Sequence, residues 1–274
     1  MSEAASRRVD LIPAQRRALI LERLRARGAA SVQELASDVG TSASTIRRDL
    51  EQLTEQGYLR RTHGGALLQR TPNATFEPEA AIAAQLARPQ KRAIGEAAAA
   101  LLEPGQSVVF DSSSTVLEAA RSAVARDIPL TAVTNDLATA TVLSASPRIR
   151  VVVPGGTVRP GSATLLGEPG EGLLRTLHAD VAFLGTHAIT GRLLTETDLD
   201  VAAMKRAVIP ASRRIVVLAD SSKFQAPAFC TICDVAEVHE VVTDDGVDPA
   251  ELAALRALGV SVTVVPAGAG VVAR

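Results

Sequence analysis

Seven short apolar runs divide the chain beyond residue 106, and their spacing constrains the fold more than any other feature. Each run has the length of a β-strand, and helical stretches lie between most of them. Strands that alternate with amphipathic helices predict a parallel or mostly parallel sheet with helices on both faces. An alanine-rich helix at 91–102 is expected before the first strand. The predicted strands are Ser107–Asp111, Leu130–Thr134, Ile149–Pro154, Val181–Gly185, Ile215–Asp220, Glu240–Thr243 and Val260–Pro266.

The first seventy residues carry a different pattern, which predicts a small helical domain. Apolar side chains recur at helical spacing between residues 15 and 27, and Gly28 is placed to end that helix. Ser31 and Glu34 then form the S-x-x-E pattern of a capping box. The capping box predicts a second helix, which Gly40 ends.

A third helix is predicted after a short turn. Either Ser42 or Ser44 can cap it, and Ile46, Leu50 and Leu53 form its inward apolar stripe. Two short helices that are joined by a glycine-containing turn make the helix-turn-helix motif, and the second of them enters the major groove of DNA. The pattern therefore predicts a DNA-binding motif in this domain.

The side chains expected to meet DNA lie at the start of the third helix and in the segment after it. Hydroxyls donate to phosphate, and arginine can bind guanine bidentately. Residues 58–68 are expected to form two short strands around a Gly-Gly turn, the wing of a winged helix. The arginines could instead only solvate a small helical domain, but the order of helices, turn and wing favours DNA binding. The candidate DNA-binding residues are Ser42, Ser44, Thr45, Arg47, Arg48, Arg60, Arg61 and His63.

Charge is unevenly distributed along the chain, although the net charge is only −1. Residues 1–70 carry 12 arginines against 8 acidic residues and have a net charge of +4, whereas residues 71–274 have a net charge of −5. Such an asymmetry suggests that the N-terminal end meets a polyanion.

Composition excludes several other classes of protein. The chain is 47% hydrophobic and 22% charged, as in soluble globular proteins, and its apolar runs are shorter than the ~20 residues of a membrane helix. The N-terminus lacks the apolar segment of ~7–15 residues that a secretory signal requires. With only two cysteines there is no disulfide framework, so we expect a cytoplasmic protein that contacts no membrane.

The N-terminal region closely resembles the signature of the deoxyribose-operon repressor (DeoR) family of bacterial regulators. The resemblance is carried by residues 16–66, and above all by STIRRDLEQLTEQGYLRRTHGGA. It implies that the third helix and the wing bind double-stranded operator DNA. It also implies a sensor domain that binds phosphorylated sugars or related metabolites.

The end of the first predicted strand carries a turn suited to binding phosphate. Asp111 is followed by the hydroxyl-rich run Ser112–Thr115, which leads directly into a helix. Backbone N–H groups at a helix N-terminus carry partial positive charge, and hydroxyls add donors to the same anion. Helix capping alone is the other interpretation of this run.

Three more strand ends carry turns that should face the same crevice, because ligands bind at the carboxyl ends of parallel strands. They are TND at 134–136, PGGTVR at 154–159, where paired glycines let the backbone approach a ligand, and DSSKF at 220–224. The resemblance to the DeoR family extends to these blocks and so covers nearly the whole chain. It implies that residues 112–115 hold the phosphate, with Asn135, Lys205 and Lys223 around the sugar. The candidate effector-binding residues are Asp111, Ser112, Ser113, Ser114, Thr115, Asn135, Gly155, Gly156, Lys205 and Lys223.

An enzyme is the competing hypothesis, because the sensor fold also resembles ribose-5-phosphate isomerases. Those enzymes carry a D-G-A-D-E block, and the matching segment here, LGTHA at 184–188, lacks both aspartates. Proton abstraction next to a carbonyl then has no evident base, and a lone His187 more often makes structural or ligand hydrogen bonds. Cys230 and Cys233 form a single C-x-x-C, for which buried packing is expected rather than a zinc or redox role. We assign no catalytic residue, metal or cofactor.

The sequence predicts a winged helix-turn-helix domain over residues 13–70, a linker over 71–89 and an α/β sensor domain over 90–270 that resembles ribose-5-phosphate isomerase. The expected function is that of a repressor of a sugar-catabolic operon, which a phosphorylated sugar releases from its operator. A phosphosugar isomerase-like enzyme fused to a DNA-binding domain is the alternative. At least a dimer is expected, because such repressors bind repeated or palindromic sites. The sugar, the operator and the sign of the effector's action stay open.

Overall fold

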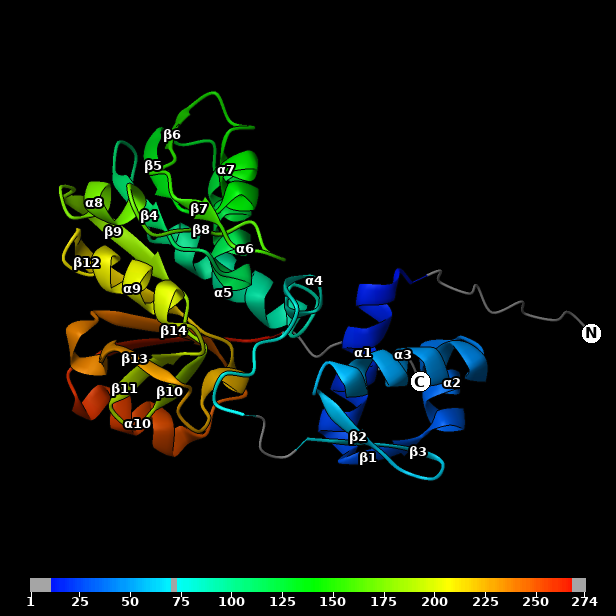
Figure 1. Ribbon diagram of the computed structural model, residues 1–274. Helices are drawn as coiled ribbons and strands as arrows, with labels where there is room; N and C mark the ends of the chain where they lie inside the picture. Colours follow the sequence, from blue (N-terminus) through cyan, green and yellow to red (C-terminus); the bar gives the residue numbers. More distant parts are fainter. Residues whose placement is uncertain (1–10, 70–72, 268–274) are drawn as a thin grey trace, which may run out of the picture. The chain divides into compact units, whose positions relative to one another are not determined.

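The structure, a computed structural model, describes residues 11–69 and 73–267. The chain divides between Leu86 and Ala87 into two compact units, and each unit has hydrophobic clusters of its own (Figure 1). No helix among the described residues is long and apolar enough to cross a membrane.

The N-terminal unit is built on three helices, whose caps follow from the sequence. The Oγ of Ser31 accepts from the N–H of Glu34, and the Glu34 carboxylate accepts from the N–H of Ser31, which confirms the predicted capping box. Of the two candidate caps of the third helix, Ser42 is the one used, since its Oγ accepts from the N–H of Thr45 at 3.1 Å. The helices are α1 (Pro13–Arg27), α2 (Val32–Val39) and α3 (Ala43–Glu55).

A buried ion pair fixes α3 against α1. The carboxylate of Asp49 is 2% exposed and receives both Nε and Nη2 of Arg16, at 2.5 and 3.0 Å. Arg17 adds a third cationic nitrogen at 3.5 Å. A bidentate pair of this kind sets orientation as well as distance. Because Asp49 faces inward, its neighbours Arg47 and Arg48 face the solvent.

A small antiparallel sheet forms the wing, and it contains one strand more than the sequence predicts. β3 lies between β1 and β2, and the close approach of β1 requires glycine at position 65. A Cβ on Gly65 would lie 2.0 Å from the carbonyl oxygen of Ala30. The strands are β1 (Ala29–Ser31), β2 (Leu59–Arg61) and β3 (Gly65–Leu68).

The segment predicted as a linker over 71–89 differs from that prediction. Residues 70–72 lie outside the described part, but the short helix α4 (Ala80–Ala83) buries Ile82, and Leu86 joins the same N-terminal core. The Tyr58 hydroxyl accepts from the N–H of Glu79 at 2.6 Å. A few spaced apolar side chains are enough to attach this segment to the unit before it.

The C-terminal unit contains a seven-stranded sheet in the order β15-β14-β12-β9-β4-β5-β6. Every neighbouring pair is parallel, and each strand falls on one of the seven predicted runs, so the predicted parallel sheet is confirmed. The strands are β4 (Ser107–Phe110), β5 (Leu130–Thr134), β6 (Ile149–Val152), β9 (Ala179–Leu184), β12 (Ser212–Leu218), β14 (Glu240–Asp244) and β15 (Ser261–Val265).

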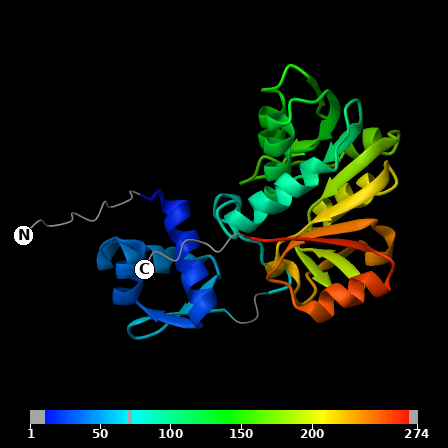
Figure 2. The ribbon, with the colours of Figure 1, turned by 180° about the vertical axis from the view of Figure 1, so that it is seen from behind.

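Both faces of this sheet are buried, because alternate residues of each strand point to opposite faces. Val108 and Phe110 pack with α5, α6 and α7, whereas Val109 packs with α8, α9 and α10. Figure 2 shows α5 lying across its face of the sheet. The helices are α5 (Arg88–Ala100), α6 (Ser114–Ala125), α7 (Leu137–Leu143), α8 (Gly170–Leu174), α9 (Leu199–Val208) and α10 (Pro249–Ala257).

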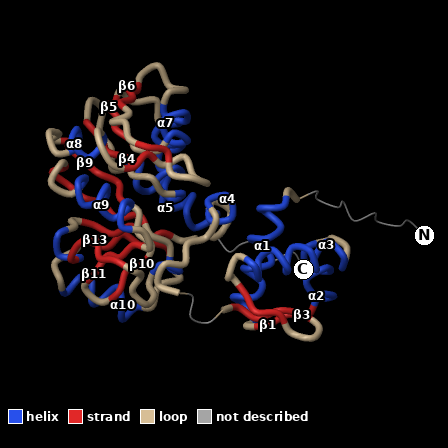
Figure 3. The backbone as a smooth tube through the Cα atoms, viewed as in Figure 1, coloured by secondary structure: helices blue, strands red, loops and turns tan. Residues whose placement is uncertain are grey.

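Two small antiparallel elements complete the unit and were not predicted (Figure 3). A three-stranded sheet has the order β10-β11-β13, and β7 pairs with β8 in a hairpin. Their strands are two to five residues long and carry little apolar periodicity. These elements are β7 (Thr157–Val158), β8 (Leu165–Leu166), β10 (Ala188–Thr190), β11 (Leu193–Glu196) and β13 (Cys230–Asp234), with single 3₁₀ turns at η1 (Ser221–Lys223) and η2 (Val235–Glu237).

The two adjacent glycines of the wing give a matched test of this packing. Gly65→Ala should lower the free energy of unfolding of the N-terminal unit by about 1–3 kcal/mol, because β1 must move away from the new methyl group. Gly64→Ala should be tolerated, since nothing lies within 4 Å of a Cβ there. Tyr58 is the only tyrosine of a chain without tryptophan, so its fluorescence during urea unfolding reports this unit. Equal stability of the two variants would contradict the assigned packing.

Candidate functional site

The predicted DNA-binding arginines form one exposed surface on α3 and the wing. Arg47 and Arg48 are exposed on α3, and Arg60, Arg61 and His63 are exposed on or beside β2. The guanidinium of Arg61 donates to the carbonyl oxygen of Arg47 at 3.3 Å. This bond joins the wing to α3, so the two carry their cations as one surface.

Hydroxyl groups gather at the N-terminus of α3. The Oγ of Ser42 lies 2.8 Å from the Oγ of Ser44 and 2.8 Å from the Oγ1 of Thr45. Ser42 and Ser44 are exposed, and Thr45 is partly exposed. The N-terminus of a helix attracts anions, and hydroxyls add donors there. This end of α3 therefore suits a DNA phosphate.

The predicted effector residues lie at the carboxyl edge of the parallel sheet. Asp111 follows β4, Asn135 follows β5, and Lys223 lies in η1 after β12. Gly185 follows β9, the strand between β4 and β12. The turns predicted to share a crevice are thus brought to one edge by the order of the strands.

The hydroxyl-rich turn after β4 caps α6 and keeps donors open. The Oγ of Ser113 accepts from the N–H of Val116 at 3.1 Å, so its own O–H can still donate to a ligand. Ser112 and Ser114 are partly exposed, whereas Thr115 is buried on the inner face of α6. Capping and phosphate binding are therefore compatible here, with Thr115 the least accessible of the run.

A buried cluster of charges holds this turn in place. The Nζ of Lys205 lies 2.7 Å from Oε2 of Glu196, 3.0 Å from the carbonyl oxygen of Gly185 and 3.5 Å from Oδ2 of Asp111. The same Oδ2 accepts from the N–H of Gly185 at 3.0 Å. Lys205 was predicted to surround the sugar. In this structure its ammonium contacts three protein acceptors.

Burial and charge set the ionisation of this cluster. Burial works against the charge of Glu196, but the charge and hydrogen bond of Lys205 outweigh it and hold the pKa of Glu196 below its usual value. Burial raises the pKa of Asp111, although Lys205 and the N–H of Gly185 oppose this. Burial would lower the pKa of Lys205, but the two carboxylates raise it, so the lysine stays charged.

Asn135 and the paired glycines have structural roles in this structure. The Asn135 amide is buried and donates to the carbonyl oxygen of Leu165 at 3.1 Å, which holds β8 over the end of β5. Gly155 and Gly156 have φ of 91° and 127°. A Cβ on Gly156 would lie 2.7 Å from the Leu166 carbonyl oxygen, so the close approach that these glycines permit is to the protein's own backbone.

Two functional candidates escaped the sequence analysis, Glu196 and Asp198. One signal in the sequence indicates that an acid lies near Lys205. This lysine shares an apolar helical stripe with Val201 and Val208, so it is expected to be buried and to need an anionic partner. Glu196 precedes α9 in an unpredicted strand, and no local pattern in the sequence marks it.

The two cysteines have different surroundings. Cys233 lies in the hydrophobic core, as predicted, and burial raises the pKa of its thiol to about 12. The thiol of Cys230 donates to the carbonyl oxygens of Glu196 and Asp198, at 3.3 and 3.5 Å. Cys230 thus helps to fix the segment between β11 and α9.

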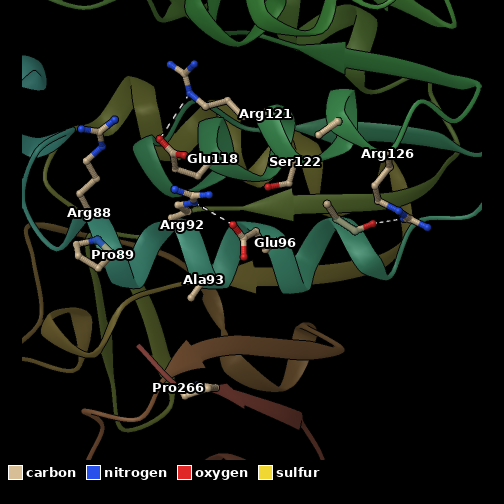
Figure 4. A pocket seen from close by; sticks show the side chains of 12 residues that line it. Arg88, Pro89, Arg92, Ala93, Glu96, Glu118, Arg121, Ser122, Arg126 and Pro266 are labelled. Carbon is tan, nitrogen blue, oxygen red and sulfur yellow. Dashed lines mark hydrogen bonds and ion pairs between the residues drawn. The ribbon is translucent and has the colours of Figure 1, made fainter. Parts of the chain in front are cut away.

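A separate groove of about 1030 Å³ lies between α5 and α6 on the outer face of the unit (Figure 4). Five of its six charged side chains have protein partners, Arg88 being the sixth. Arg92 pairs with Glu96, Arg121 pairs with Glu118, and Arg126 donates to backbone carbonyls. None of the predicted effector residues lines it. The groove is therefore distinct from the carboxyl edge of the sheet, where those residues lie.

The charge cluster predicts a measurable loss when its cation is removed. Lys205→Met leaves two buried carboxylates without their partner, and such a change costs about 3–5 kcal/mol of unfolding free energy. Adding Glu196→Leu should restore part of this, because one of the stranded charges disappears. Urea unfolding followed by circular dichroism measures both variants.

The deficit of Lys205→Met should shrink as the pH falls from about 8 to about 5. The stranded carboxylates would have folded-state pKa values above their unfolded values, so they favour folding only when protonated. A deficit that is independent of pH and of Glu196 would show that lost packing, rather than charge, is the cause.

Each of the two units matches the model of a known protein family. Residues 16–71 match the DeoR-like helix-turn-helix domain, and residues 87–245 match the DeoR C terminal sensor domain. Among solved structures, ribose 5-phosphate isomerase A of Methanocaldococcus jannaschii matches 49% of this chain and 53% of its own, with 16% identity and a TM-score of 0.38. That distant likeness carries no conclusion about activity.

Several known regulators are similar along most of their length. GlpR of Haloferax volcanii is 31% identical over 92% of this chain and 98% of its own. The repressor CsqR of Escherichia coli K12 is 32% identical over 80% and 83% of the two chains. The L-fucose operon activator of Haemophilus influenzae is 33% identical over 82% and 90%. All three names describe transcription regulators rather than enzymes, and with the two domain matches they show that this chain belongs to the DeoR family of DNA-binding transcription regulators.

Proposed function

We propose that this regulator represses a sugar-catabolic operon and leaves its operator when a phosphorylated sugar binds. The observation that carries the proposal is the turn Ser112–Ser114 at the N-terminus of α6. Its hydroxyls, and the N–H of Ser114 at the start of α6, can donate at the carboxyl edge of a parallel sheet, where ligands of such sheets bind. The N–H of Ser113 already donates to the carbonyl oxygen of Asp111. The names of the relatives include both a repressor and an activator, so the sign of the effect is part of the proposal.

The exposed cations of the N-terminal unit support a docking mode. We place α3 in the major groove, with Arg47 and Arg48 toward base edges and phosphates. Arg60, Arg61 and His63 of the wing then follow the backbone or the minor groove. Asp49 and Arg16 hold α3 in the orientation that this requires.

The crevice offers different partners to the two ends of a sugar phosphate. Phosphate oxygens need donors, which the turn at 112–114 supplies. Hydroxyls can donate to carboxylates, and Oδ2 of Asp220 is buried with no hydrogen-bond partner among the described residues. We therefore expect the phosphate on the turn after β4 and sugar hydroxyls toward Asp220, with Lys223 beside them.

Release of DNA follows from linkage between the two sites. If the effector binds one conformation of the sensor more tightly, it shifts the population toward the state with lower operator affinity. Symmetric operators need at least two DNA-binding units, so we propose at least a homodimer, acting in the cytoplasm.

Loss of either helix arginine should weaken operator binding. Arg47→Ala and Arg48→Ala should each reduce affinity by about 10- to 100-fold, the effect of losing one specific contact. Arg25→Ala removes an exposed arginine of α1 outside this surface and serves as the control. Affinity should also fall steeply as salt rises, because phosphate contacts release counterions. Wild-type affinity in both α3 variants, measured by fluorescence anisotropy, would contradict the docking.

A charge in the phosphate turn should make the repressor non-inducible. Ser113→Asp keeps a good helix cap but puts a carboxylate where the phosphate must lie. We expect binding of sugar phosphates, measured by calorimetry, to be lost, while operator affinity without effector is retained. Ser122→Asp adds the same charge in the third turn of α6 and should bind like wild type. Normal induction of Ser113→Asp would assign the phosphate to another loop.

A further inference from the structure

Arg159 lies in the segment that follows the carboxyl end of β6, and it is paired with an acid. It follows β7, and its Nη2 lies 3.1 Å from Oδ2 of Asp198. The two side chains are 25% and 32% exposed, so the pair is only partly buried. Pairs of this exposure contribute little net stability, so an exchange of partner costs little.

The hairpin that carries Arg159 is tied to the end of β5. The Leu165 N–H donates to the backbone carbonyl oxygen of Asn135 at 2.7 Å. The side-chain amide of Asn135 donates to the carbonyl oxygen of Leu165 at 3.1 Å. The N–H of Leu137 donates to the carbonyl oxygen of Ala163 at 2.9 Å. Arg159 is therefore presented by an ordered hairpin.

Asp198 lies between β11 and α9. Its Oδ1 caps α9 by accepting from the N–H groups of Asp200 and Val201, at 2.9 and 3.1 Å. Two residues earlier, Glu196 binds Lys205, which in turn contacts Asp111. Ion pairs thus connect the end of β4 to Glu196 through Lys205. The chain continues from Glu196 to Asp198, which pairs with Arg159. The hairpin that carries Arg159 is bonded to the end of β5, the neighbour of β4 in the sheet.

A phosphate at this edge needs a cation that a ligand can reach. Lys205 faces two carboxylates and a carbonyl oxygen, and residues 71–274 carry a net charge of −5. Guanidinium groups match phosphate bidentately, which an ammonium cannot do. Arg159 is 25% exposed, and its ion pair with Asp198 is only partly buried.

We propose that Arg159 is a ligand of the effector's phosphate, and that Asp198 holds it in reserve when the crevice is empty. This assignment rests on the proposed function. Phosphate and the Asp198 carboxylate compete for one guanidinium. The competition gives the two residues opposite effects on binding, whereas a merely structural clasp would give them the same effect.

Calorimetry of the full-length chain with inorganic phosphate and with D-ribose 5-phosphate separates these cases. Arg159→Gln should weaken binding of both probes by about tenfold or more, because it removes a charge-assisted bidentate contact. Asp198→Asn should strengthen binding by a few fold, since the amide oxygen still caps α9 but the competing charge is gone. The charge-swapped double variant Arg159→Asp/Asp198→Arg can restore the ion pair and should still bind weakly.

A second pair offers a matched control. Arg192 lies 3.4 Å from Asp234, whose Oδ1 likewise caps a helical turn, here η2. Arg192→Gln and Asp234→Asn should leave the binding of both probes unchanged. A fall in affinity in both Arg159→Gln and Asp198→Asn would show that the pair is only a clasp and would overturn the assignment.

The outcomes also separate this assignment from the function it rests on. If Ser113→Asp abolishes binding and Arg159→Gln does not weaken it, the sensor function stands and the role of Arg159 is wrong. If the wild-type chain binds neither probe, and no other sugar phosphate, both are wrong.

Discussion

The buried ammonium of Lys205 is the interaction on which the sensor unit depends. It joins three pieces of chain: the end of β4, the residue after β9 and the last residue of β11. A lysine buried here is tolerable only because two carboxylates and a carbonyl oxygen replace its water. Since Asp111 directly precedes the hydroxyl-rich turn, the position of that turn depends on the cluster. The candidate phosphate site is therefore held by charges that do not themselves need to touch phosphate.

A buried acid with a cationic partner also positions an element in the DNA-binding unit. Asp49 accepts Arg16 on the inner side of α3, which leaves Arg47 and Arg48 on the outer side. In both units an inward acid fixes an element whose outward groups suit an anion, DNA phosphate in one and a sugar phosphate in the other.

Most of the fold could be predicted because its patterns are local. The seven strands were visible as apolar runs, and the caps at Ser31 and Ser42 follow from short-range chemistry. What escaped prediction is non-local. β1 exists because Gly65 lets it approach β3, and Glu196 matters because folding brings it to Lys205. The attachment of Ile82 and Leu86 to the N-terminal core depends on contacts with residues distant in sequence, whereas the prolines of this segment locally predict a linker.

The central claim is that a phosphate group in the sensor unit lowers operator affinity in the other unit. The most direct measurement is an anisotropy titration of the operator complex with a panel of sugar phosphates, each paired with the same sugar without its phosphate. The account predicts that at least one phosphorylated sugar releases the DNA and that its unphosphorylated partner does not. Release by both members of each pair, or by no member of a broad panel, would contradict it.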